Sequence, residues 1–272
     1  MRLIRAELLK IRTTGTWLVF GLVFLGLWTL TFGMNWLTTS LGLEAGGGIE
    51  LDPETGEFLT DTPAVAANLY TNGQFFGLLL VMLFAAIIVT SEFFQQTATT
   101  TFLQTPRREL VVLAKLVAAT LVGLAFWLAS TVLNLVLGPV VLAASDAGPQ
   151  LGEGKVWAAI LLNGLAYALW AILGVGAGVL IRSQLAATIT LSLVYVVGFL
   201  GSATFFLLIG PRFGSWFPAL QVLVPPQASQ LLVNGAHLPG NPPRWAGAVV
   251  LILYALGAGF AGTLIMKKRD IT

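Results

Sequence analysis

Long apolar runs separated by short polar segments dominate the hydrophobic pattern of this chain. A helix needs about 20 apolar residues to cross the hydrocarbon core of a membrane. Six runs of roughly that length predict spans at about 17–37, 74–90, 110–137, 156–181, 188–209 and 246–266. One such run is also compatible with a buried helix of a soluble protein. Six of them, with almost no internal charge, predict an all-α polytopic membrane protein formed by one transmembrane domain over residues 1–272.

The composition excludes several kinds of chemistry. Of 272 residues only 10% are charged, whereas soluble domains carry roughly 25%. Cysteine is absent and His237 is the single histidine, so thiolate chemistry and Cys- or His-built metal sites are excluded. The sequence has no phosphate-binding G-x-x-x-x-G-K-[ST] motif, and its spans lack the carboxylates of ion-coupled pumps. We therefore expect no catalytic residue, no metal and no cofactor bound by this chain.

The basic residues predict the orientation in the membrane. Of the 14 Lys and Arg residues, all except Lys155, Arg212 and Arg244 fall on one side of the predicted spans, while the acids collect mainly in 38–73. The positive-inside rule then places both termini and residues 91–109 in the cytoplasm. We expect a multi-pass protein of the cell membrane (plasma or inner). Lys115 follows shortly after this segment, and its long side chain is expected to reach the lipid headgroups.

Two further polar segments separate the predicted spans on the extracytoplasmic side of the membrane. Residues 38–73 are predicted to be an acidic, glycine-rich loop. In 210–245, residues 216–224 and 227–233 are apolar but too short to span, which predicts short extracytoplasmic helices before the last span. Pro225-Pro226 is expected to end the first of them.

An amphipathic pattern opens the chain. In 2–12, Ile4, Leu8 and Ile11 recur at i, i+4 and i+7, which predicts a helix lying in the inner membrane surface with a basic flank towards anionic lipid. The alternative is a basic tail without fixed structure. The polar residues assigned to this interfacial helix are Arg5, Glu7, Lys10 and Arg12.

The polar segment 91–109 is too elaborate for a plain turn between spans. Phe94, Ala98 and Phe102 fall on one helical face, which predicts a helix over 91–104 whose two phenylalanines anchor it to the rest of the chain. Thr105 is a good N-cap and Pro106 a favoured first residue for the following span.

The residues of this segment resemble a known family. Glu92, Thr97-Ala-Thr-Thr-Thr101-Phe-Leu, Thr105-Pro106, Arg108 and Lys115 look like the stretch between the second and third spans of type-2 ATP-binding-cassette (ABC) permeases. The N-terminal Ala6-Glu-Leu-Leu-Lys10, followed by a Trp-containing first span, is also typical of that family. One departure is Phe94-Gln95-Gln96, where family members often carry a basic, Gly-containing triplet.

The resemblance implies the permease subunit of an ATP-driven exporter with the type-2 ABC exporter fold. Residues 91–104 would be the coupling helix that docks on a separate ATPase subunit, which would hold ATP and Mg²⁺. The other implied partners are a second permease copy or paralogue and the lipid bilayer, with no nucleic acid. Charge reversal at Glu92 is then expected to uncouple the ATPase without affecting folding. The expected contact residues are Glu92, Phe93, Gln95, Gln96, Thr97, Thr101, Phe102, Thr105, Pro106, Arg107 and Arg108.

A different function remains compatible with the same residues. A non-transporting integral-membrane scaffold or assembly factor would use segment 91–109 to dock another partner. It too would need no nucleotide site of its own.

Overall fold

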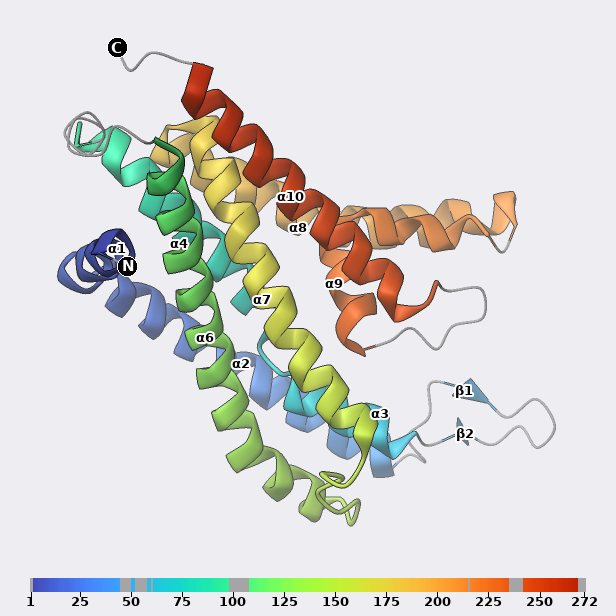
Figure 1. Ribbon diagram of the computed structural model, residues 1–272. Helices are drawn as coiled ribbons and strands as arrows, with labels where there is room; N and C mark the ends of the chain where they lie inside the picture. The colour runs from blue at the N-terminus through green and yellow to red at the C-terminus, as the bar shows by residue number, and fades with distance from the viewer. Residues whose placement is uncertain are drawn as a thin grey trace.

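The computed structural model describes residues 2–44, 50–51, 58–59, 61–97, 108–214, 216–234 and 242–268, and these are almost entirely helical (Figure 1). The α-helices are α1 (Arg2–Thr13), α2 (Thr16–Glu44), α3 (Thr62–Tyr70), α4 (Gln74–Phe94), α6 (Arg108–Ala144), α7 (Gly154–Ile181), α8 (Gln184–Phe213), α9 (Pro225–Asn234) and α10 (Arg244–Lys268). A 3₁₀ helix, η1, covers Pro218–Leu223, and β1 (Glu50–Leu51) pairs antiparallel with β2 (Phe58–Leu59).

Six helical segments within the described residues are long and apolar enough to cross a membrane. The prediction of an all-α protein with six candidate spans is therefore confirmed. The candidate spans are Thr16–Ser40, Thr62–Phe94, Leu110–Ala144, Gly154–Ile181, Gln184–Gly210 and Arg244–Gly262.

The predicted loop 38–73 is more structured than its composition indicated. Helix α2 continues to Glu44, and α3 forms directly before α4. The Asp61 carboxylate caps α3 by accepting a hydrogen bond from the Ala64 N–H at 3.1 Å, and Pro63 lies in the first helical turn. Both residues are favoured where a helix begins, because the cap satisfies a free N–H and proline has none to leave unsatisfied.

Helix α7 lies at the centre of the bundle and packs against α4, α6 and α10, the last two lying beside it in Figure 1. Two glycines of α7 permit the close approach of α4. A Cβ added at Gly174 would clash with the Met82 carbonyl oxygen, and one at Gly178 would lie 2.8 Å from that of Ala86. Small residues at such a crossing let two helix backbones touch, which gives tight packing between membrane helices.

The break between α3 and α4 is closed by a buried polar cluster. Asn134 of α6 donates hydrogen bonds to the carbonyls of Tyr70 and Asn72, at 2.9 and 3.1 Å, and accepts one from the Trp28 indole at 3.0 Å. Gly73 follows with φ +84°, a conformation that side chains rarely adopt. Carbonyls released by a helix break inside a membrane protein need internal partners, and Asn134 supplies them.

Helices α8 and α9 depart from the simple bundle. In Figure 1, α8 extends away from the diagonal helices, and only 12% of its apolar window is buried in the chain. Pro225 and Pro226 stand at the start of α9, so the proline pair that was predicted to end one helix also begins the next. The first turn of a helix tolerates proline because its N–H groups have no intrahelical acceptor.

Candidate functional site

Four charged side chains from three helices meet at one end of the bundle and form a closed ion network. The Lys10 ammonium lies 2.8 Å from carboxylate oxygens of both Glu7 and Glu92. The Lys115 ammonium lies 2.8 Å from the second oxygen of Glu7 and 2.7 Å from Glu92. Each ammonium therefore contacts both carboxylates, and the network joins α1 to α4 and α6.

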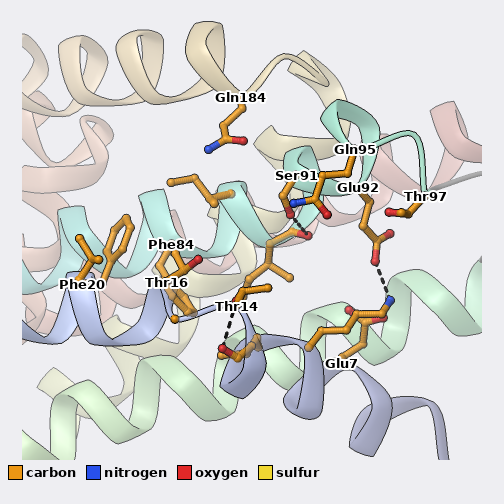
Figure 2. Close-up of a pocket in the computed structure, with 16 residues that line it drawn as sticks. Glu7, Thr14, Thr16, Phe20, Phe84, Ser91, Glu92, Gln95, Thr97 and Gln184 are labelled. Carbon is orange, nitrogen blue, oxygen red and sulfur yellow. Dashed lines mark hydrogen bonds and ion pairs between the residues drawn. The ribbon is translucent and has the colours of Figure 1, made fainter.

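Local helix geometry places these groups. Glu7 and Lys10 are three residues apart on α1, the spacing at which side chains share a helix face. Glu92 lies in the last turn of α4, and Lys115 lies near the start of α6, which packs against α1. Figure 2 shows Glu92 pointing from α4 towards the part of α1 that carries Glu7.

The network is largely withdrawn from water. The side chain of Lys115 is 1% exposed, those of Glu7 and Glu92 are 6% and 10% exposed, and Lys10 is half exposed. Two acids face two bases, so the cluster buries no net charge. Taking one partner from a buried ion pair costs roughly 3–5 kcal/mol, because the remaining charge stays desolvated without compensation. We therefore expect the network to fix the three helix ends against one another.

The pKa shifts on α1 agree with this geometry. Burial raises the pKa of Glu7, but the Lys115 charge and the hydrogen bonds from Lys10 and Lys115 outweigh burial and hold the pKa below 4.5. Burial lowers the pKa of Lys10, but hydrogen bonds to Glu7 and Glu92 outweigh it and raise the pKa above 10.5. Lys10 therefore stabilises the fold fully below pH 10.5. This stabilisation is lost only as the pH rises through the higher folded-state pKa of Lys10.

The expectation that Lys115 reaches the lipid headgroups is wrong. Its ammonium is buried between Glu7 and Glu92, because the two carboxylates compensate the charge that burial removes from water. Glu92 is likewise engaged inside the chain, so charge reversal there would place three cations together and destabilise the fold. We therefore expect Glu92→Lys to impair folding as well as coupling, in place of the sequence-based expectation that folding stays intact.

Helix α4 ends beside the network in a defined turn. The Thr97 N–H donates to the Glu92 carbonyl at 3.0 Å, and the Gln96 N–H donates to the Phe93 carbonyl at 3.3 Å. Gln96 has φ 56°, so this is a Schellman-type end with a left-handed residue at its centre. We call residues 93–97 the α4 turn. The Arg182 guanidinium lies 5.3 Å from the centroid of the Phe93 ring and ties the turn to the end of α7.

The other predicted site residues fall into three groups. Gln95, Gln96 and Thr97 are exposed on the α4 turn, as Arg5 and Arg12 are on α1. Phe94 is 77% exposed, so the expectation that it anchors the segment to the chain is wrong: the α4 turn directs this ring away from the bundle. The predicted contacts Thr101, Phe102, Thr105, Pro106 and Arg107 lie outside the described residues, as does the second half (98–104) of the predicted helix 91–104. Arg108 begins α6.

The fold and this site define a multi-span α-helical membrane protein whose helix ends are joined by a buried ion network. The chain belongs to the family described as protein of unknown function (DUF2705), whose model matches residues 56–272. Glu92 and Lys115 lie within the matched region, and α1 precedes it. No curated protein matches the chain.

Proposed function

We propose that this chain is the membrane-spanning subunit of an ATP-driven exporter of the type-2 ABC class, and that the α4 turn transmits movement from a separate ATPase subunit. The observation that carries the proposal is the pair of ion contacts of Glu92 with Lys10 and Lys115, at 2.8 and 2.7 Å. They fix the end of a candidate span to two other helices, directly beside an exposed turn.

A coupling element has to be stiff as well as accessible, since a ligand shifts an equilibrium only through contacts that differ between two states. The network supplies the stiffness, because a displaced turn carries α1 and the start of α6 with it. The close packing of α4 on α7 at Gly174 and Gly178 extends the same rigid unit through the bundle. Glu92 is therefore a positioning residue in this proposal.

The exposed residues of the turn supply the contact surface. Phe94 presents a large apolar ring next to the amides of Gln95 and Gln96. Aromatic side chains that enter a pocket of the partner contribute much of the binding energy in many interfaces. We therefore assign Phe94 to the ATPase contact, in place of the anchoring role expected from the sequence.

Site-specific photocrosslinking in the native cell tests the proposal. A photoreactive amino acid at Gln96 is expected to crosslink a soluble protein that carries a phosphate-binding Walker motif. The matched control is the same amino acid at Trp157, which is exposed at the opposite end of α7.

The purified pair should hydrolyse ATP, while this chain alone should show no saturable nucleotide binding. Crosslinking from Gln96 to a protein without a nucleotide site would instead favour the scaffold or assembly factor. Saturable ATP binding by the single chain would overturn its assignment as a subunit that relies on a partner ATPase.

A further inference from the structure

A cleft of about 990 Å³ opens beside the ion network, between α1, α2, α4 and the first turn of α8. Figure 2 shows the side chains that line it. Ligand sites typically enclose about 300–1,000 Å³ and combine apolar walls with a few polar groups. The size of the cleft therefore suits a small amphiphilic ligand.

The cleft is polar at one end and apolar at the other. Lys10, Glu92 and Gln95 line the polar end, whereas Phe20 and Phe84 meet edge to face at the apolar end, with ring centroids 5.2 Å apart. Gln95, the C-cap of α4, lies 11 positions after Phe84, so the two ends lie about 16 Å apart along the helix. This is the polarity gradient of a lipid headgroup followed by an acyl chain.

The rim of the cleft borders the membrane. Val19 lines it and is 61% exposed on α2, which is a candidate span. An apolar side chain exposed on such a helix contacts lipid when the helix crosses a bilayer. A lipid molecule can therefore enter the cleft sideways without passing through water.

The charges around the polar end select the headgroup. Two carboxylates balance two ammonium groups there, so the network offers no excess positive charge to a net anion. It still offers hydrogen-bond donors, because Lys10 has a third N–H beyond those that bond Glu7 and Glu92. Among the described residues, the side-chain amides of Gln95 and Gln184 at the cleft have no hydrogen-bond partner.

We propose that this cleft binds one zwitterionic phospholipid from the leaflet in which α1 lies. Its phosphate accepts hydrogen bonds from Lys10 and Gln95, its headgroup ammonium faces Glu92, and part of one acyl chain lies along Phe20 and Phe84. The proposal requires only that the chain spans a membrane. It is independent of any transport function and is tested without an ATPase.

Native mass spectrometry of the detergent-purified chain tests the apolar half. The wild type is expected to retain one phosphatidylethanolamine. Val19→Trp should reduce the retained lipid about tenfold, which corresponds to ~1.4 kcal/mol, because the indole fills the cleft. Val23→Trp is the matched control: Val23 is exposed one turn further along α2, outside the cleft lining, and should retain lipid as the wild type does.

A titration of the delipidated wild-type chain tests the headgroup and does not depend on any variant. Phosphatidylethanolamine should bind more tightly than phosphatidylglycerol of the same acyl chains. Gln95→Leu should weaken phosphatidylethanolamine binding, whereas Gln96→Leu, outside the cleft lining, should not. Equal lipid loss in Val19→Trp and Val23→Trp, or preference for phosphatidylglycerol, would overturn the proposal. Loss of coupling to an ATPase would leave it standing.

Discussion

Replacing Lys115 by methionine removes one cation from the buried network and keeps a side chain of similar length. Glu7 and Glu92 then share the half-exposed Lys10 as their remaining cation in the network. Removing one partner of a buried ion pair costs roughly 3–5 kcal/mol. Because Lys10 still contacts both carboxylates, we expect a loss near the lower limit, about 3 kcal/mol of unfolding free energy.

The matched control is Lys155→Met. Lys155 pairs with Asp61 at 3.5 Å, and both side chains are exposed. Exposed ion pairs contribute about 0–1 kcal/mol, so this variant should unfold almost as the wild type does. Reversible unfolding in mixed detergent micelles measures both variants against the wild type. If Lys115→Met and Lys155→Met unfold at the same denaturant concentration, the network does not hold the helix ends together.

A double-mutant cycle with Glu92→Gln identifies the interaction responsible. Glu92→Gln removes the carboxylate that lies 2.7 Å from the Lys115 ammonium. Once Lys115 is methionine, the second change should cost less than it does alone, because it removes a carboxylate that has already lost one partner. Contacting charges show coupling energies of about 0.5–3 kcal/mol. Strict additivity would refute the assignment of the Lys115 effect to this ion pair.

Three other predictions follow from the helices and charges described above. Because folding lowers the pKa of Glu7, this residue stabilises the fold fully above pH 4.5. The stabilisation should be lost as the pH falls through the folded-state pKa, so the free energy of unfolding should fall more steeply with pH in that range. Gly174→Ala should cost about 1–3 kcal/mol by overpacking, whereas Gly257→Ala, with open space around it, should be neutral or stabilising in the same unfolding assay. In intact cells an impermeant thiol reagent should label Glu153→Cys but not Gln96→Cys, since the native chain has no cysteine; the reverse pattern would invert the predicted topology.

The apolar runs identified the six candidate spans because hydropathy depends only on neighbouring residues. The ion network depends instead on pairs such as Glu7 and Lys115, which are 108 residues apart, and no local pattern joins them. One signal was present all the same. Lys115 lies inside an apolar run, and a charge within a span normally has a partner in the bundle. Glu7 and Glu92 are acids on the side that is otherwise rich in basic residues.

The hydropathy pattern also could not predict how the helices pack. The length and apolar character of α8 predicted a span, but its position away from the diagonal helices depends on how it packs against α4, α7, α9 and η1. The exposure of Phe94 has a similar cause. Helical periodicity placed its ring on an inward face of a continuing helix, whereas α4 ends at Phe94 and Gln96 reverses the backbone. Helical periodicity does not predict where a helix ends when no glycine or proline follows its last turn.

The four charges divide into two neutral pairs, and this division makes a last prediction about α1. Glu92 and Lys115 form one pair at 2.7 Å between α4 and α6, and Glu7 and Lys10 form the other at 2.8 Å within α1. Removing both charges of α1, by Glu7→Gln with Lys10→Met, leaves the remaining pair intact and neutral. This double substitution should therefore cost less than the roughly 3 kcal/mol expected for Lys115→Met alone.

The same unfolding assay tests whether the two pairs are independent. The control is Glu7→Gln alone, which leaves the network with two cations and one carboxylate. If the double variant is less stable than this single variant, the charges act as one indivisible cluster. If it is more stable, α1 can leave the bundle without exposing an unpaired charge in the core. Electrostatics would then permit α1 to move as a unit while α4 and α6 stay joined.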